Sequence, residues 1–233
     1  CIDAPVHLAC ARSLLAEPEV ATLRGVYVCP RLAHAPRVME TTLLAARALH
    51  LITGGTGGLG LRAARWLSQR GTCALALASR SGALQRDVAM EWEHIQASAT
   101  TTFVHRCDTT QAAHVQDAMT AHSFPPTMGV WHAAGVLEDG VLPAQTPGPL
   151  RRVYAPKVHG AWTLQQSCAR MPLCTFAFFS SVAALLGGSG QANYSAANAC
   201  LDALASSRRV HSTCSTSVQW GAWAEVGMAA RGA

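Results

Sequence analysis

The pattern of apolar and polar residues changes near Leu49. From this residue onward, short apolar segments alternate with longer segments in which apolar residues recur at helical spacing. Six segments are predicted to be strands, at 50–53, 73–78, 102–107, 129–132, 174–179 and 216–220. Five are predicted to be helices, at 61–70, 87–97, 112–122, 150–171 and 194–209, with Gly71 ending the first and Pro156 bending the fourth. This alternation is typical of a single doubly wound α/β domain, in which helices cover both faces of a parallel sheet.

Residues 1–48 have a different texture. Val26–Cys29 is predicted to be a short strand, and Met39–Leu49 has a helix-forming composition. No residue in this part carries recognisable chemistry, so we interpret residues 1–48 as a structural flank and residues 49–233 as the functional domain. The sequence does not begin with Met and has no obvious stop, which favours a piece of a longer polypeptide.

Composition narrows the class of protein. Half of the residues are hydrophobic and 13% are charged, which predicts a sizeable buried core. The net charge is +5, but the arginines are scattered, so the basic stripe of a nucleic-acid surface is not expected. The nine cysteines show neither CxxC pairs nor a Cys/His pattern, so we expect reduced thiols, no metal site and a cytoplasmic location. Apolar runs such as Phe176–Phe179 are too short to cross a bilayer.

A glycine-rich segment, Thr53–Gly60, follows the first strong strand and precedes a helix. It reads TGGTGGLG. Glycine allows the backbone to approach a pyrophosphate closely, and the helix N-terminus offers free N–H groups to the negative charge. A plain tight turn is the ordinary alternative, but the strand before it and the helix after it favour a dinucleotide loop. The residues expected to contact the cofactor here are Thr53, Gly54, Thr56, Gly57, Gly58 and Leu59.

Three later strand ends are predicted to complete the cofactor site. The second strand ends near Ser79 and Arg80, and an Arg at this position suits the 2′-phosphate of NADP, although a solvated surface Arg is the alternative. Asp108 follows the third strand and is expected near the adenine. The fourth strand runs into small residues expected near the nicotinamide ribose, in the segment His132, Ala133, Ala134 and Gly135.

Four side chains are predicted to carry the chemistry. Reduction of a ketone needs a hydride donor and an acid that protonates the developing alkoxide. Tyr194 opens a helix thirteen residues after Ser181, Asn198 lies four residues further on, and Lys157 lies on the preceding long helix. Each has an ordinary explanation on its own: Ser181 as a strand-end cap, Tyr194 as a half-buried helix residue and Lys157 as a solvated lysine. Together they indicate an active site, in which a nearby cation is expected to favour the phenolate of the tyrosine.

A resemblance to a known family connects these residues. Thr53–Gly60 resembles the TGxxxGxG loop of short-chain dehydrogenases/reductases, and the Ser181–Tyr194 spacing is similar to theirs. Ordinary members carry Lys four residues after the Tyr, where this chain has Asn198. Ketoreductase domains of polyketide synthases and animal-type fatty acid synthases exchange the Lys and Asn positions, and their PKxxGxxxL segment is matched by Pro156–Leu164. The chain is similar to these domains over about three quarters of its length.

The resemblance implies a fold, a cofactor and roles. It implies a Rossmann-type sheet and NADPH, with Tyr194 as the general acid and Ser181 as its partner on the substrate oxygen. Lys157 would support Tyr194 and the proton relay, and Asn198 would order that relay. The family's substrates are β-ketoacyl chains on the phosphopantetheine arm of an acyl carrier protein, so this carrier and neighbouring synthase domains are the expected partners.

The family's stereochemical markers are partly matched. An LDD segment goes with one product class, and here Leu137-Glu138-Asp139 keeps the final Asp but has Glu in the middle. The other class carries Trp eight residues before the catalytic Tyr, where this chain has Leu186. The resemblance therefore implies a D-configured (B-type) 3-hydroxyl, while a simple cap for the following segment is the alternative role of the two acids. The remaining positions expected on the substrate side are Gln191, Trp220 and Trp223, with Ala222–Ala229 in a mobile cover.

Two other functions remain open at this point. One is a free-standing dehydrogenase for a small alcohol, against which the Lys157/Asn198 exchange argues. The other is a catalytically silent structural module, which would not need Ser181, Tyr194 or the glycine loop. Residues 19–32 resemble the last strand region of the noncatalytic half that precedes such ketoreductases, which would make the flank a remnant of that half.

Overall fold

The computed structural model describes residues 21–23, 26–28, 48–85, 88–121, 127–211 and 213–223. The chain divides into two units, Cys1–Thr42 and Leu43–Ala233. In the first, β1 (Ala21–Leu23) pairs antiparallel with β2 (Val26–Val28). The predicted strand corresponds to β2, whereas β1 was not predicted. The helix expected over Met39–Leu49 lies outside the described residues except for Ala48 and Leu49, and Leu49 begins β3.

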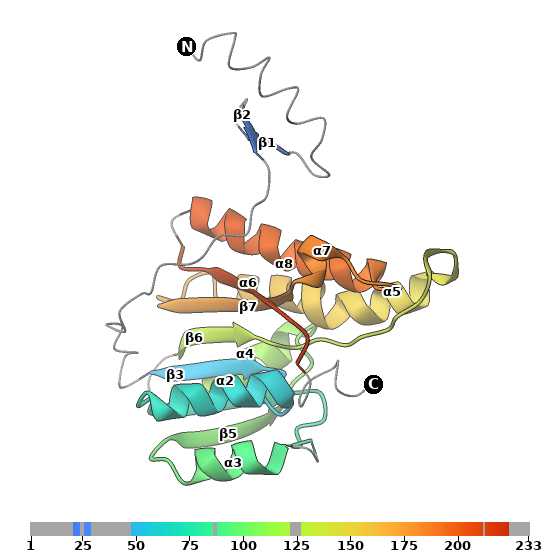
Figure 1. Ribbon diagram of the computed structural model, residues 1–233. Coiled ribbons are helices and arrows are strands. Elements are labelled where there is room, and N and C mark those ends of the chain that lie inside the picture. Colours follow the sequence, from blue (N-terminus) through green and yellow to red (C-terminus); the bar gives the residue numbers. More distant parts are fainter. Residues whose placement is uncertain are drawn as a thin grey trace. The chain divides into compact units, whose positions relative to one another are not determined.

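The second unit is built on a six-stranded sheet in which every neighbouring pair is parallel. Its strands are β3 (Leu49–Thr53), β4 (Ala74–Ser79), β5 (Thr101–Arg106), β6 (Thr127–His132), β7 (Thr175–Ser181) and β8 (Thr216–Trp220). Their order across the sheet is β5-β4-β3-β6-β7-β8 (Figure 1). The six predicted strands and the doubly wound α/β class are confirmed. The order reverses between β3 and β6, and ligands of such sheets bind at the carboxyl ends of the strands beside this reversal.

Helices lie on both faces of the sheet, and Figure 1 shows α2 in front of it and α4 behind it. The helices are α2 (Gly58–Gln69), α3 (Ala89–Gln96), α4 (Ala112–Thr120), α5 (Pro147–Tyr154), α6 (Gly160–Ser167), α7 (Ala183–Leu186) and α8 (Ala192–Val210). A 3-10 turn, η2 (Leu142–Ala144), and a π-helix, η3 (Ala155–His159), complete the set. The predicted bend at Pro156 is confirmed, because η3 separates α5 from α6. Neither η2 nor α7 was predicted.

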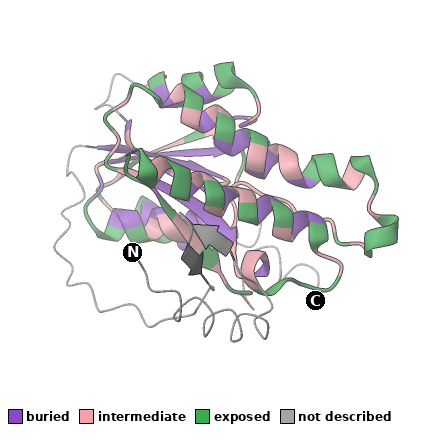
Figure 2. Ribbon diagram, turned by 90° about the horizontal axis from the view of Figure 1, so that it is seen from above, coloured by how far each residue is buried: buried purple, intermediate pink, exposed green. Residues whose placement is uncertain are grey.

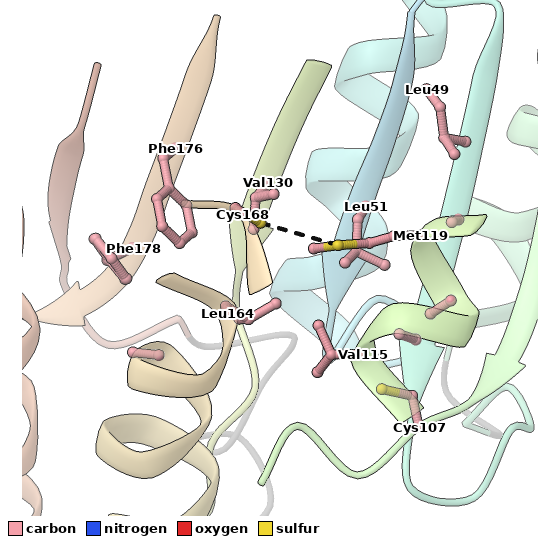
Figure 3. Close-up of a cluster of buried hydrophobic side chains, with 14 of the residues drawn as sticks. Leu49, Leu51, Cys107, Val115, Met119, Val130, Leu164, Cys168, Phe176 and Phe178 are labelled. Carbon is pink, nitrogen blue, oxygen red and sulfur yellow. Dashed lines mark hydrogen bonds between the residues drawn. The ribbon is translucent and has the colours of Figure 1, made fainter. Parts of the chain in front are cut away.

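Alternation along the central strands builds two cores. In β4, Ala74, Ala76 and Ala78 belong to one core, and Leu75 and Leu77 belong to the other. The first core packs α4, α6 and α8 against the sheet, and Figure 3 shows its side chains from α4, α6 and the strands. The second packs α2 and α3 against the opposite face. Figure 2 shows the buried strands between helices whose outer sides are exposed, so ligands reach this sheet at its ends.

Among the described residues, the structure shows no helix that combines the length and the apolarity needed to span a membrane.

Candidate active site

A cleft of about 840 Å³ opens at the carboxyl ends of the strands. Most of the predicted cofactor residues line it, namely Gly54, Thr56, Gly57, Ser79, Arg80, Asp108, Ala134 and Gly135. Leu137 and Glu138 line it as well. The other predicted cofactor residues are not among the lining residues: Thr53, Gly58, Leu59, His132 and Ala133. Of these, Thr53 and His132 are fully buried, so they can act on a ligand only through their neighbours.

The glycine loop requires glycine where it meets the end of β6. Gly54 has φ +67°, and a Cβ there would lie 2.8 Å from the backbone of Ala133. A Cβ on Gly60 would clash with the carbonyl oxygen of Gly54. Helix α2 starts at Gly58, and its N-cap, Gly57, makes no side-chain capping hydrogen bond. A backbone cradle at an uncapped helix N-terminus fits a pyrophosphate group.

The end of β4 forms a tight turn beside the cleft. Gly82 has φ +64°, and its N–H donates to Ser79 Oγ over 3.1 Å. The hydroxyls of Ser79 and Ser81 lie 3.3 Å apart, with the exposed Arg80 between them in the chain. Two hydroxyls and a guanidinium at one turn form a donor set that fits a phosphate group.

Asp108 lies at the same end of the cleft. Burial raises its pKa, but hydrogen bonds from Thr110 and the charges of Arg80 and His114 outweigh this effect and lower the pKa. Thr110 donates to Asp108 Oδ1 from its N–H over 3.0 Å and from Oγ1 over 2.8 Å. The charge of Arg80 therefore reaches Asp108, and the two residues predicted for the adenosine end lie close together.

Lys157 is the only lysine in the sequence, and it is buried in η3 with an exposed fraction of 2%. Its ammonium donates to the carbonyl oxygen of Phe179 over 3.0 Å and lies 5.2 Å from the centre of the Tyr194 ring. Burial lowers the pKa of Lys157 to about 7, against an opposing effect of Asp202. The explanation of Lys157 as a solvated lysine is therefore wrong.

Tyr194 is almost as well buried, with an exposed fraction of 9%. Burial raises its pKa and the charge of Asp139 raises it further, while hydrogen bonds with Asn198 and Ser181 act in the lowering direction. The sequence predicts that a nearby cation favours the phenolate, but burial has the largest effect on this tyrosine and the pKa is raised. Lys157 itself is only partly charged near its own pKa of about 7. Tyr194 consequently holds its proton at neutral pH.

Asn198 and Ser181 flank Tyr194. Asn198 is fully buried, and its Nδ2 donates to the backbone oxygen of Tyr194 over 2.8 Å. Its Oδ1 is buried without a partner among the described residues. Ser181 Oγ accepts from the N–H of Ala183 over 3.2 Å, so its explanation as a strand-end turn residue is confirmed. A hydroxyl that accepts one bond can still donate another, and Ser181 also hydrogen-bonds with the side chain of Tyr194.

The segment after β6 is tied to two helices. Arg152 of α5 forms a two-armed ion pair with Glu138, with Nε donating to Oε2 over 2.6 Å. Gln191 Nε2 donates to Asp139 Oδ2 over 3.2 Å, and Asn193 Nδ2 donates to the backbone oxygen of Glu138 over 2.9 Å. The explanation of the two acids as caps is wrong, because η2 has Val141 as its N-cap and no side-chain capping bond.

Arg152 was not predicted as a site residue, and its neighbour Arg151 also lines the cleft. No short motif marks either residue. Val136 and Leu137 line the cleft and also pack against the cluster that contains Tyr194. This shared packing connects the residues predicted to hold the cofactor with those predicted to be catalytic.

The remaining predicted substrate positions lie apart from the cleft lining. Leu186 is 72% exposed on α7. The ring of Trp220 lies 5.3 Å from that of Phe179 and 5.8 Å from that of Trp223, and Arg62 stacks over Trp223. The expected cover lies outside the described residues from position 224 onward. Within the part of the chain that the structure describes, no group of three His, Cys, Asp or Glu side chains could hold a metal ion.

Comparison with known proteins gives consistent matches. A family model described as "KR domain" matches residues 48–225. Polyketide synthase GfsA of Streptomyces halstedii is 39% identical over 216 residues, which cover 91% of this chain and 3% of that protein. The 6-methylsalicylic acid synthase of Aspergillus terreus is 37% identical over 236 residues, which cover 91% of this chain and 13% of that protein. The chain therefore spans a small part of these relatives.

Solved structures are similar over almost the whole chain. A structure of A-type ketoreductases from a modular polyketide synthase matches with a TM-score of 0.82 and 33% identity, over 97% of this chain and 50% of that one. The PlmKR1 ketoreductase from phoslactomycin biosynthesis in Streptomyces sp. HK803 matches with a TM-score of 0.79 and 36% identity, over 91% of this chain and 50% of that one. The chain spans about half of each of these solved chains.

Proposed function

Because the chain belongs to the family of polyketide synthase ketoreductase (KR) domains, we propose that it uses NADPH to reduce the β-keto group of an acyl chain on an acyl carrier protein. Membership implies an oxidoreductase that reduces a β-keto group; the cofactor, the carrier and the residue roles are our proposal. The observation that carries it is the approach of the only lysine, Lys157, to within 5.2 Å of the Tyr194 ring, next to a glycine-lined cleft.

The cleft residues fit an NADP dinucleotide. The backbone cradle at Gly54 and the N-terminus of α2 would hold the pyrophosphate, and the turn around Arg80 would hold the 2′-phosphate. The hydroxyls of Ser79 and Ser81 lie at the same turn, and each would have to turn from its present acceptor, Ser81 Oγ and Ala83 O respectively, to donate to that phosphate. When bound, NADPH supplies the hydride.

The chain's own residues supply the proton and its delivery. Tyr194 carries the proton because burial raises its pKa, and it would donate this proton to the carbonyl oxygen as that oxygen gains charge. Ser181 would donate a second hydrogen bond to the same oxygen. Addition of hydride to the carbonyl carbon and of a proton to its oxygen gives the alcohol.

Two further residues would restore the acid. Phe179 holds Nζ of Lys157 beside the tyrosine ring, where the ammonium would stabilise the phenolate left by proton transfer. It would then donate a proton to that phenolate through a water and take one up from solvent. The unpartnered Oδ1 of Asn198 would accept from a water in that relay.

We propose a D-configured (B-type) product. The final acid of the Leu137–Asp139 segment is present and points its carboxylate to Gln191, and no Trp occupies position 186. Chiral analysis of the product alcohol tests this part alone, and an L-alcohol would refute it.

The reaction is tested by following NADPH absorbance with a β-ketoacyl thioester or trans-1-decalone. We expect oxidation with a preference for NADPH over NADH, and loss of about 10²- to 10⁴-fold in kcat for Tyr194→Phe, the range of general acid catalysis. NADPH binding, measured by its fluorescence, should persist in Tyr194→Phe. No oxidation by folded wild type would favour the silent module, and a strong preference for small free ketones would favour the free-standing dehydrogenase.

A further inference from the structure

We propose that His132 is a positioning residue, which holds the peptide carbonyl of Lys157 and links it to Thr53 of the dinucleotide loop. The inference rests on the proposed function for its catalytic consequence. Its structural part concerns only where the Lys157 side chain lies, and it can be tested without turnover.

The hydrogen bonds of His132 define its tautomer. Nε2 lies 3.0 Å from the carbonyl oxygen of Lys157, and Nδ1 lies 2.7 Å from Oγ1 of Thr53. A carbonyl oxygen only accepts, so Nε2 carries the hydrogen. In a neutral ring Nδ1 then accepts, and the hydroxyl of Thr53 must donate to it. The result is a directed chain from Thr53 through the imidazole to Lys157.

The surroundings keep the imidazole neutral. His132 is fully buried, and burial lowers its pKa to about 4. A protonated ring would carry a hydrogen on both nitrogens. Nδ1 could then no longer accept a hydrogen bond from the hydroxyl of Thr53. Neutral His132 matches both partners at the same time.

The residues that follow η3 pack closely against Thr109 and His132. A Cβ on Gly160, the first residue of α6, would clash with Oγ1 of Thr109 and would lie 3.3 Å from Cε1 of His132. The N–H of Gly160 also donates to the carbonyl oxygen of Lys157. These contacts hold the π-helix close to His132. Single π turns of this kind recur at functional sites.

Lys157 is therefore held at its backbone carbonyl and at the end of its side chain. His132 holds its carbonyl, and Phe179 holds its ammonium over 3.0 Å. Loss of the carbonyl anchor should let the π turn relax, which would move the ammonium relative to Tyr194. Displacements of about 1 Å in a catalytic group can reduce rates by about 100-fold.

Two variants separate the two nitrogens of the ring. His132→Gln retains a donor that can reach the Lys157 carbonyl but loses the acceptor for Thr53. His132→Asn retains an acceptor near the Nδ1 position but is too short to reach the Lys157 carbonyl. We expect His132→Asn to reduce kcat by about 10- to 100-fold with little change in NADPH affinity, and His132→Gln to restore most of kcat.

A second readout does not depend on activity. Because Lys157 is the only lysine, lysine labelled at Cε with ¹³C gives a single side-chain NMR signal, shifted by the Tyr194 ring. We expect His132→Asn to move this signal toward that of an exposed lysine and His132→Gln to keep it near its wild-type position. An unmoved signal and unchanged kcat in folded His132→Asn would overturn the inference.

Failure of the proposed function is distinguishable, because an inactive wild type still gives the lysine signal. If His132→Asn does not fold, the tautomer of His132 is read in the wild type from its imidazole ¹⁵N signals, which are assigned by their loss in His132→Gln. Hydrogen on Nε2 and an accepting Nδ1 support the inference, and hydrogen on Nδ1 with a bare Nε2 overturns it.

Discussion

The ammonium of Lys157 lies 5.2 Å from the centre of the Tyr194 ring, and burial shifts the pKa of both residues toward their neutral forms. The tyrosine pKa is raised, so the phenol keeps its proton at neutral pH. The lysine pKa of about 7 means that its amine gains and loses a proton easily near pH 7. Tyr194 thus holds a proton, and the neighbouring Lys157 can exchange one near pH 7. Repeated protonation of a substrate requires both properties.

Replacement of Lys157 by Met is expected to stabilise the protein below pH 7 while abolishing activity. The pKa of Lys157 is about 7 in the folded chain, against an ordinary value of 10.5. The folded protein therefore loses stability as the pH falls from 10.5 to 7, because the unfolded chain binds a proton that the folded chain does not. The full loss is on the order of 5 kcal/mol, offset in the variant by about 1–3 kcal/mol for leaving the Phe179 carbonyl without its donor. Urea unfolding at pH 6 and pH 9.5 measures the gain, which should shrink at the higher pH.

Lys157→Arg provides the control for that experiment. Arginine stays charged throughout this range, so the variant should be destabilised at both pH values. A Met variant whose gain does not change with pH would contradict a buried, titrating lysine.

Acid is expected to destabilise the fold between pH 6.5 and pH 4. Burial lowers the pKa of His50 and of His132 from 6.5 to about 4. Between these pH values the unfolded chain binds protons at both histidines and the folded chain does not. The stability contribution of each is present above pH 6.5 and is lost as the pH falls toward 4, by up to about 3 kcal/mol per histidine. His50→Asn keeps an acceptor for Trp131 Nε1, which donates to His50 Nδ1 over 3.1 Å. Denaturant melts at pH 6.5 and 4.5 should show roughly half the acid loss in this variant; an undiminished loss would assign the effect elsewhere.

Removal of the Arg80 guanidinium is expected to weaken NADPH binding selectively. Charge-assisted hydrogen bonds contribute about 1.5–3 kcal/mol, so Arg80→Ala should raise the Kd for NADPH by about 10- to 100-fold and leave the Kd for NADH nearly unchanged. Arg70→Ala is the matched control, because it removes the same charge at a residue that stacks on Trp66 and does not line the cleft. Fluorescence titration with both cofactors measures the ratio. An equal rise in the Kd for NADPH and for NADH in Arg80→Ala would show that Arg80 does not recognise the 2′-phosphate.

Disruption of the Glu138–Arg152 ion pair is expected to loosen stereochemical control. The pair anchors the segment after β6 to α5, and Arg152→Ala would free that side of the segment. We expect a lower enantiomeric ratio in the product alcohol with a smaller change in rate. Arg151→Ala removes a neighbouring charge that also lines the cleft but is not paired with Glu138, so it should leave the ratio unchanged. Similar erosion in both variants would point to charge alone and not to the anchor.

The sheet and its helices could be predicted because their signals are local. β4 is apolar at every position of its buried run, and Gly71 ends α2 with φ +80°, as the sequence predicts. The four catalytic candidates and the glycine loop could also be found, because their spacing resembles a family pattern. β1 and α7, with three and four residues, were missed because such short segments carry almost no periodicity.

Contacts between distant segments could not be predicted. The bond from His132 to the carbonyl of Lys157 depends on how β6 meets the π-helix, and no sequence spacing encodes it. The same holds for Arg152 and Glu138, which belong to a helix and a loop. The raised pKa of Tyr194 could not be predicted for a related reason, because it depends first on how deeply the ring is buried.

Burial of a sole lysine inside a π-helix has a consequence for proteolysis. An endoproteinase that cuts only after lysine finds one susceptible bond in this sequence, between Lys157 and Val158. A protease needs an extended segment, so the cut requires that this helical turn unwind first. The rate at which two fragments appear therefore measures how often the turn around Lys157 opens.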